Sequence, residues 1–155
     1  MGKRALLSNL KVLLLEGRQS QKFDLKPEYS NRVVALNQNT KSLMNSLNVW
    51  EHVEKMRLQP VRYMQVWDAC SDALISFSSS DVLDDDVAYI VENDLLLHAI
   101  DKELKSPNVK NVDIVYGAKI SGYELPQKND LKMETIVNMN NGDAYTCQLL
   151  VLHFI

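Results

Sequence analysis

A chain of 155 residues, with 46% apolar and 24% charged side chains, allows one ordinary soluble globular domain and is unlike a disordered protein. Its formal net charge of -3 provides no general attraction to phosphate backbones, so we expect no nucleic-acid partner. The two cysteines, Cys70 and Cys147, lie far apart in the sequence and indicate neither a disulfide scaffold nor a structural zinc site.

The first part of the chain predicts two strands followed by a helix. The continuous apolar run Lys11–Glu16 is typical of a strand that is buried on both faces of a parallel sheet. A polar loop over Ser20–Asn31 separates it from a short strand at Val33–Leu36. Apolar residues at helical spacing predict a helix over Asn37–Leu47, and Asn48 can adopt the left-handed conformation that ends it.

The middle of the chain predicts a further helical turn and then two antiparallel strands. The helical turn covers residues 50–56. The strands Val61–Asp68 and Ala73–Phe77 are rich in β-branched and aromatic residues and are joined by a short polar turn. A polar loop over Ser78–Asp86 follows them.

A second helix is predicted after an extended segment at Tyr89–Glu92. Asn93 has a side chain that can cap this helix. Its expected core positions are Leu96, Ile100 and Leu104, which repeat at helical spacing.

The last part of the chain predicts four strands. Asn111–Tyr116 and Ala118–Glu124 come first, followed by a polar connection over Leu125–Leu131. Alternating apolar residues in 133–139 and 145–151, on either side of an Asn-Asn-Gly-Asp turn, predict a β-hairpin. Helices and strands in this mixture predict a mixed α/β fold.

Two residues have a chemical interpretation beside a purely structural one. Glu16 ends a buried strand, where dinucleotide-binding folds place an acid that binds the ribose hydroxyls, but an acid after an apolar run is also common. Arg32 precedes a strand and can offer a planar fork to a phosphate or ribose oxygen, although a surface salt bridge explains it equally simply. The histidines His52, His98 and His153 lie too far apart to predict a metal site.

Four segments carry a family resemblance: LKVLLLEG at 10–17, YSNRVVALNQNTKSL at 29–43, MQVWDACSDALISF at 64–77 and YIVENDLLLHAI at 89–100. Together, and in this order, they closely resemble the ubiquinone-biosynthesis monooxygenases, which are FAD-dependent aromatic hydroxylases. The resemblance is closest to the mitochondrial, eukaryotic member and runs from about Leu10 to Val151.

The resemblance implies a partial FAD-binding domain of the glutathione-reductase type, with an inserted β-sheet layer for the substrate. We expect residues 1–155 to form one such partial domain. Residues 10–56 and 87–105 would belong to the FAD-domain layer, and residues 61–78 and 112–147 to the β-rich layer.

The resemblance also implies an oxidoreductase that hydroxylates the aromatic ring of a polyprenylated phenol or quinone precursor. Glu16 matches the acid that binds the ribose of FAD, Arg32 matches an arginine near the flavin, and Asn93 matches the residue that opens a helix directed at FAD. Catalytic residues are not assigned, and no metal is implied. The implied partners are an electron donor, either NAD(P)H or a ferredoxin system, and other ubiquinone-biosynthesis proteins, at the matrix face of the mitochondrial inner membrane.

One departure from the family pattern concerns the cofactor directly. The family begins with a Gly-x-Gly-x-x-Gly turn that lets the backbone approach the diphosphate, and no two of the five glycines of this chain lie two residues apart. We therefore expect a partial enzyme that is poorly stable and holds no FAD by itself. The alternative is a non-catalytic fragment that acts as a binding module in the ubiquinone-biosynthesis assembly.

Overall fold

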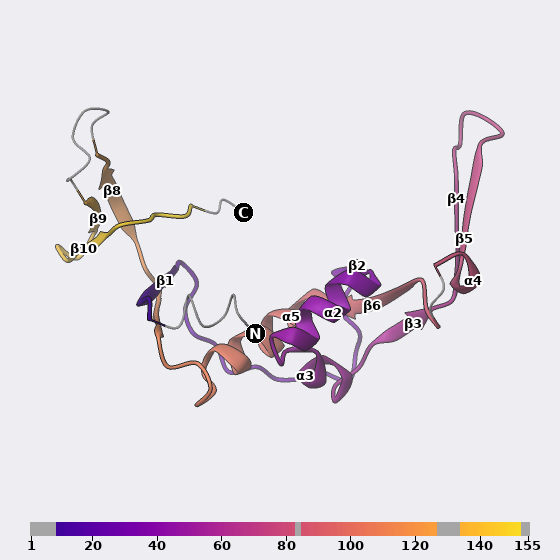
Figure 1. Ribbon diagram of the computed structural model, residues 1–155, viewed down its shortest axis with the longest axis horizontal. Coiled ribbons are helices and arrows are strands. Elements are labelled where there is room, and N and C mark those ends of the chain that lie inside the picture. Colours follow the sequence, from indigo (N-terminus) through magenta and orange to yellow (C-terminus); the bar gives the residue numbers. More distant parts are fainter. Residues whose placement is uncertain (1–8, 83–84, 127–133, 153–155) are drawn as a thin grey trace. The chain divides into compact units, whose positions relative to one another are not determined.

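The computed structural model describes residues 9–82, 85–126 and 134–152. The chain divides into two compact units, one formed by residues 1–22 and 111–155 and the other by residues 23–110. Helices and several small sheets alternate along the chain, which confirms the predicted mixed α/β class (Figure 1). The division of the chain into an FAD-domain layer and a β-rich layer stays a prediction.

The unit of residues 23–110 is built on a three-stranded antiparallel sheet in the order β2–β6–β3. These strands are β2 (Val33–Leu36), β6 (Ala88–Glu92) and β3 (Gln59–Val61). The helices α2 (Gln38–Ser46), α3 (Trp50–Glu54) and α5 (Asn93–Leu104) belong to the same unit. Among the described residues, no helix is long and apolar enough to cross a lipid bilayer.

One hydrophobic cluster holds this sheet and its helices together. Its buried members are Val49, Trp50, Val53, Tyr89, Val91, Leu95 and Ala99. The rings of Trp50 and Tyr89 meet edge to face with their centroids 5.2 Å apart, the arrangement that aromatic pairs prefer. Burial of these side chains fixes α3 and α5 against the central strand β6.

Helix α5 buries a different stripe from the one predicted. Leu95, Ala99 and Glu103 are its buried residues, whereas Leu96 and Ile100 are only half-buried beside the core. Three leucines in succession supply an apolar residue on several faces of the helix, so the sequence pattern does not settle which one turns inward. Contact with α3 and β6 settles it in the structure.

Of the two signals predicted at helix ends, the one at Asn48 is confirmed and the one at Asn93 is not, while the cap of α2 was not predicted. The Asn37 side chain caps α2 by accepting a hydrogen bond from the Thr40 amide at 2.9 Å. Asn48 has a φ of 59°, the left-handed conformation predicted for it. The prediction for α5 was wrong by one residue, because Glu92 occupies the extended N-cap position and Asn93 is the first helical residue.

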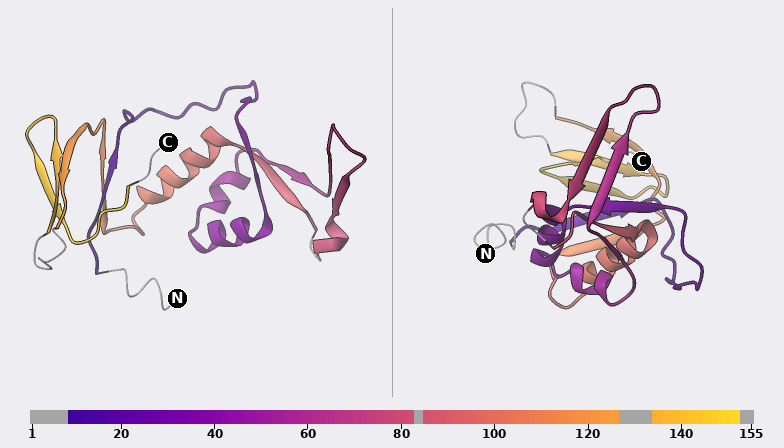
Figure 2. Two further views of the ribbon diagram at one scale, coloured as in Figure 1. Left: turned by 90° about the horizontal axis from the view of Figure 1, so that it is seen from above. Right: turned by 90° about the vertical axis from the view of Figure 1, so that its right-hand side faces the viewer.

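A β-hairpin extends from this unit away from its helices (Figures 1 and 2). It consists of β4 (Tyr63–Trp67) and β5 (Leu74–Ser78), which pair antiparallel as predicted. The single strand predicted over Val61–Asp68 is broken at Arg62, because β3 pairs with β6 while β4 pairs with β5. The loop predicted after β5 begins instead with a short helix, α4 (Ser79–Val82).

In the other unit, β1 (Val12–Glu16) pairs in parallel with β7 (Val112–Tyr116). The parallel arrangement agrees with the prediction, but the expectation of burial on both faces was wrong. Val12 is 45% exposed and Leu14 is 41% exposed. Within the described residues β1 has only one strand neighbour, so its side chains lack the cover that a larger parallel sheet provides.

The last three strands of this unit, β8 (Ile120–Glu124), β9 (Thr135–Met139) and β10 (Ala144–Cys147), form an antiparallel sheet in the order β10–β9–β8. The hairpin of β9 and β10 is confirmed, with Gly142 in the left-handed region at a φ of 90°. The predicted continuation of this strand to Val151 was wrong, since β10 ends at Cys147. Met133 and most of the predicted connection at 125–131 lie outside the described residues.

Candidate functional site

Two of the three predicted cofactor residues, Arg32 and Asn93, lie side by side in the structure. Strands β2 and β6 pair antiparallel with Val33 opposite Glu92, which brings the start of one strand to the end of the other. The Asn93 amide therefore donates a hydrogen bond to the Arg32 carbonyl at 2.9 Å. Arg32 is exposed, and its guanidinium makes no hydrogen bond or ion pair with the residues that the structure describes.

An ion pair beside this junction was missed by the sequence reasoning. The Arg57 Nε lies 2.8 Å from Glu92 Oε1, and Arg57 Nη2 donates to Glu92 Oε2 at 3.0 Å. Such a two-point contact between guanidinium and carboxylate fixes the orientation of both groups. The partners are 35 positions apart, so no local pattern announces the pair.

Arg57 also holds the loop that leads to Arg32. Its guanidinium donates to the carbonyl oxygens of Pro27 at 3.3 Å and of Glu28 at 3.0 Å, and it lies 4.5 Å from the centre of the Tyr29 ring. The loop is thus attached to the end of β6 through the Arg57 side chain and through the Ser30 backbone, which hydrogen-bonds Glu92. This attachment positions the backbone that carries Arg32.

The ionisation of Glu92 supports the same arrangement. The hydrogen bond from Arg57 is the largest cause that holds the pKa of Glu92 below its ordinary value. A backbone hydrogen bond from Ser30 lowers this pKa further, while partial burial opposes both effects. Glu92 is therefore a carboxylate at neutral pH and keeps Arg57 engaged.

The third predicted residue, Glu16, lies in the other unit, at the end of β1. Its Oε1 accepts a hydrogen bond from the Arg18 amide at 2.8 Å, and its carbonyl accepts one from the Ala118 amide at 3.0 Å. The half-buried carboxylate thus closes a turn at the end of the strand.

The glycines near Glu16 do not form a cradle for a diphosphate. A methyl group built on Gly17 would have only the Ala118 carbonyl oxygen within ordinary contact distance, at 3.8 Å, so this glycine is not required by a close approach. Gly117 has a φ of 66° and lies against the Gln19 side chain, so it is required by its turn. The described residues around Glu16 therefore include no glycine-rich turn that could hold a diphosphate.

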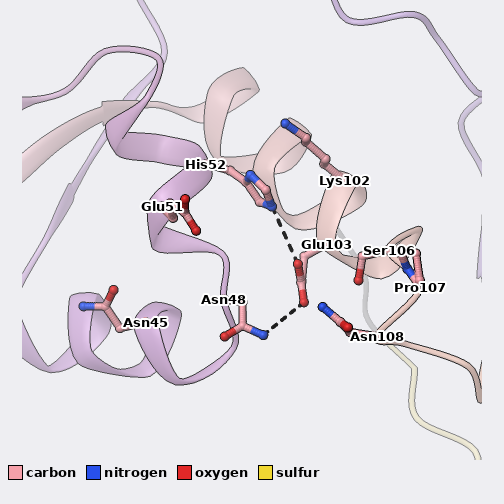
Figure 3. Close-up of a pocket in the computed structure, with 9 residues that line it drawn as sticks. All are labelled: Asn45, Asn48, Glu51, His52, Lys102, Glu103, Ser106, Pro107 and Asn108. Carbon is pink, nitrogen blue, oxygen red and sulfur yellow. Dashed lines mark hydrogen bonds and ion pairs between the residues drawn. The ribbon is translucent and has the colours of Figure 1, made fainter.

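A pocket of about 720 Å³ lies in the unit of residues 23–110, between the α2–α3 turn and the end of α5 (Figure 3). It is lined by Asn45, Asn48, Glu51, His52, Lys102, Glu103, Ser106, Pro107 and Asn108. The buried Glu103 accepts a hydrogen bond from Asn48 Nδ2 at 3.4 Å and lies 3.6 Å from His52 Nε2. This contact joins α3 to α5, and none of the predicted cofactor residues lines the pocket.

Among the described residues, no group of three or more histidine, cysteine, aspartate or glutamate side chains is placed to hold a metal ion. His52 contacts Glu103, and the His98 ring stacks on Phe23 with centroids 4.1 Å apart. His153 lies outside the described residues.

Comparison with known proteins places the chain among its relatives. No protein-family model matches the sequence. The chain is 39% identical over 150 residues to the ubiquinone biosynthesis monooxygenase COQ6, mitochondrial, of Danio rerio, an alignment that covers 94% of this chain and 30% of that protein. The chain is a relative of the ubiquinone-biosynthesis monooxygenases. It spans about 30% of the length of the curated relatives it matches.

Solved structures of other proteins share the fold of this chain. The p-nitrophenol 4-monooxygenase PnpA of Pseudomonas putida matches with a TM-score of 0.58 at 13% identity, over 90% of this chain and 32% of that one. HpxO of Klebsiella pneumoniae, solved in complex with FAD and uric acid, matches with a TM-score of 0.52 at 11% identity, over 90% of this chain and 38% of that one. These likenesses concern the fold alone.

Proposed function

We propose that this relative of the ubiquinone-biosynthesis monooxygenases is part of an FAD-dependent oxidoreductase that hydroxylates the aromatic ring of a polyprenylated ubiquinone precursor. The observation that carries the proposal is the 39% identity over 94% of the chain to a protein named for that pathway. The substrate is a polyprenylated phenol or quinone precursor. A reductant, either NAD(P)H or a ferredoxin system, supplies the electrons.

The cofactor role is proposed for Glu16, Arg32 and Asn93. The junction of β2, β6 and α5 supports it, because an exposed guanidinium and the first residue of a twelve-residue helix lie together there. A helix N-terminus and an arginine both favour a negatively charged oxygen. The Arg57–Glu92 pair then acts as a positioning contact for the Arg32 loop.

The diphosphate of FAD needs groups that these residues do not supply. Backbone amides in a glycine-rich turn usually bind a diphosphate, and no two of the five glycines of this chain lie two residues apart. We therefore propose that the 155-residue chain by itself holds no FAD. A stoichiometric flavin band in the visible spectrum of the purified chain after incubation with FAD and gel filtration would refute this.

The location proposed for the function is the matrix face of the mitochondrial inner membrane, together with other ubiquinone-biosynthesis proteins. The name of the Danio rerio relative includes the word mitochondrial. A polyprenylated substrate is apolar and resides in a membrane. Immunolocalisation followed by protease protection of isolated mitochondria tests both parts of this proposal.

A chimera tests the enzymatic function. In it, the 155-residue chain replaces the matching segment of the Danio rerio relative. Ubiquinone is then measured in cells that lack that relative. We expect the chimera to restore ubiquinone, its Arg32→Ala variant to lose most of this activity, and the matched Arg62→Ala variant to retain it. Arg62 is a suitable control because its side chain is 81% exposed and lies outside the proposed cofactor residues.

Two results would count against the proposal in different ways. A soluble chimera that restores no ubiquinone contradicts the monooxygenase function. Equal activity of the Arg32 and Arg62 variants contradicts the role of Arg32 at the cofactor while leaving the function in place.

A second candidate is a non-catalytic binding module in the ubiquinone-biosynthesis assembly. The observation that favours it is the exposed apolar surface of the β4–β5 hairpin, where Val66 and Ile75 are both more than half exposed. Co-purification of the flavin-free chain with ubiquinone-biosynthesis proteins supports this candidate. Loss of every such partner under mild conditions contradicts it.

A further inference from the structure

The turn that joins β9 to β10 (Figure 1) contains the one asparagine of the chain that a glycine follows. This asparagine is Asn141, and the glycine is Gly142. The side chain of an asparagine can be attacked by the amide nitrogen of the next residue, and glycine obstructs that attack least because it has no Cβ. Both residues are exposed to solvent. The turn therefore combines two conditions that favour loss of an asparagine side-chain amide.

The reaction is an intramolecular substitution at the side-chain carbonyl of Asn141. The Gly142 nitrogen forms a bond to Asn141 Cγ, the bond between Cγ and Nδ2 breaks, and ammonia leaves with the proton that the Gly142 nitrogen gives up. Water then opens the resulting succinimide ring. Addition of water at Cγ leaves aspartate, and addition at the main-chain carbonyl leaves isoaspartate, in which the chain runs through the side chain. The sequence of steps consumes only water and needs no oxidant or reductant.

Hydrogen bonds of the folded turn engage every group that this reaction uses. The Gly142 amide, which supplies the attacking nitrogen, donates to the Met139 carbonyl at 3.1 Å. Asn141 Nδ2, the nitrogen that leaves, donates to Asp143 Oδ2 at 2.7 Å. Asn141 Oδ1 accepts a hydrogen bond from the Asp143 amide at 3.1 Å. Because these contacts hold the Asn141 side chain and the Gly142 amide apart from each other's service, the attack requires that they first be broken.

The same turn is tied to all three strands of its sheet. The Met139 amide donates to the Asp143 carbonyl at 2.9 Å, and the Asn140 amide donates to the carbonyl of Lys119, just before β8, at 2.8 Å. Gly142 has a φ of 90°, as a glycine at the bulge of a short hairpin loop requires. Opening of the turn is therefore the step that limits the attack on Asn141 in the folded chain.

The product of the reaction weakens the turn that formed it. Asn141 Nδ2 donates to the Asp143 carboxylate, whereas an ionised carboxylate at position 141 has no hydrogen to donate and repels Asp143. Isoaspartate in addition lengthens the main chain, so the bond from the Gly142 amide to the Met139 carbonyl loses its geometry. Both products therefore loosen the end at which β9 and β10 are joined.

We propose that Asn141 is a site of spontaneous deamidation through attack by the Gly142 nitrogen, and that the contact between Asn141 and the Asp143 side chain sets its rate in the folded chain. The substrate is the chain itself, and no enzyme takes part. The modification goes beyond the proposed monooxygenase function and does not depend on FAD, because every group that it uses lies within residues 139–143.

Incubation of the purified full chain at neutral pH, with and without urea, tests this inference. Peptide mass spectrometry measures the loss of each amide, and a protein-isoaspartate methyltransferase detects isoaspartate. We expect Asn141 to yield both aspartate and isoaspartate, and to react at least about tenfold faster in urea, where the hydrogen bonds of the turn are absent. Asn140 is the internal control, because it is equally exposed in the same turn but is followed by asparagine, and it should keep its amide.

Two substitutions of Asp143 test its control of the rate. Asp143→Ala removes the oxygen that accepts from Asn141 Nδ2 and should raise the rate in the folded chain about fivefold. Asp143→Asn keeps an acceptor oxygen and should raise the rate less. Each rate is divided by the rate of the same chain in urea, so that any direct effect of residue 143 on the chemistry cancels.

Hydrogen exchange separates loss of this one contact from loss of the hairpin. The Met139 amide donates to the main-chain carbonyl of residue 143, so its exchange should be the same in the unchanged chain and in Asp143→Ala. If exchange at Met139 rises in Asp143→Ala, the Asp143→Asn chain carries the comparison, and its ratio must still exceed that of the unchanged chain. In Asn141→Asp, a stand-in for one product, exchange at the Met139 and Gly142 amides should be faster.

Each part of the proposal has a result that would overturn it. An Asn141 amide that survives in urea removes the site itself. Aspartate without isoaspartate would mean that water, and not the Gly142 nitrogen, attacks the side chain. Equal ratios of folded to urea rates for the unchanged chain and both Asp143 variants would contradict control by Asp143. Unchanged exchange in Asn141→Asp would show that the product does not loosen the turn.

Discussion

Replacement of Leu95 by alanine should destabilise the unit of residues 23–110 strongly. Leu95 is 1% exposed and lies in the buried cluster with Trp50 and Val53. The substitution removes three buried carbon groups, worth about 0.8 kcal/mol each in transfer free energy. The cavity left behind raises the total loss in the free energy of unfolding to about 3–4 kcal/mol. Leu97, two residues further along α5, is 45% exposed, and Leu97→Ala should cost less than about 1 kcal/mol.

Urea unfolding followed by tryptophan fluorescence measures both losses. Trp50 is buried and Trp67 is 70% exposed, so a Trp67→Phe background reports the environment of Trp50 alone. An unfolding midpoint that falls by about 1–3 M for Leu95→Ala, at unchanged slope, agrees with the expected loss. Equal effects of the two alanine variants, or a larger effect of Leu97→Ala, would refute the observed orientation of α5.

Three further predictions concern other features of the same unit. Burial is the largest cause that lowers the pKa of His98 in the folded chain. The contribution of neutral His98 to the free energy of unfolding should therefore be fully present above pH 6.5 and should fall as the pH drops from there toward the folded pKa. A His98→Gln variant should show a flatter dependence of its urea midpoint on pH. Glu92 has a lowered pKa in the folded chain, so the Arg57–Glu92 pair should stabilise the fold above pH 4.5 and lose this effect as the pH falls through the folded pKa. In the Glu92→Gln variant, the urea midpoint should no longer fall over this acidic range. Asn48 adopts a left-handed conformation, so Asn48→Ala should lower the free energy of unfolding in urea by about 1 kcal/mol more than Asn48→Gly does. Equal losses would mean that this conformation is not strained for alanine.

Elements with a strong local pattern could be predicted from the sequence. The β9–β10 hairpin follows from strict alternation around an Asn-Gly turn, and α2 follows from apolar residues at helical spacing and the left-handed residue at Asn48. In each case the residues that decide the structure lie within a few positions of one another. The type and the approximate ends of these elements are therefore local properties.

Features that depend on distant contacts could not be predicted. The break between β3 and β4 arises because Val61 pairs with Ala88 while Tyr63 pairs with Ser78. Likewise, the face of α5 that turns inward is selected by α3 and β6 rather than by the run of three leucines.

The candidate site likewise has some features that the local sequence predicts and others that depend on distant contacts. The position of Arg32 ahead of a strand was visible in the sequence, whereas its neighbour Asn93 was brought to it by the pairing of β2 with β6. The family resemblance supplied both residues, but it did not indicate that Arg57 binds Glu92 and the Arg32 loop together. A bidentate ion pair between residues 35 positions apart requires knowledge of the tertiary fold.

The parallel pairing of β1 with β7 has a consequence for synthesis on the ribosome. Val12 emerges early, but its partner Val112 emerges only after the whole of residues 23–110 has been translated. That intervening unit contains its own sheet and buried cluster, so it can condense first. Until translation reaches β7, the leucines of β1 lack the strand partner that the described residues give them and are open to chaperones and to wrong partners.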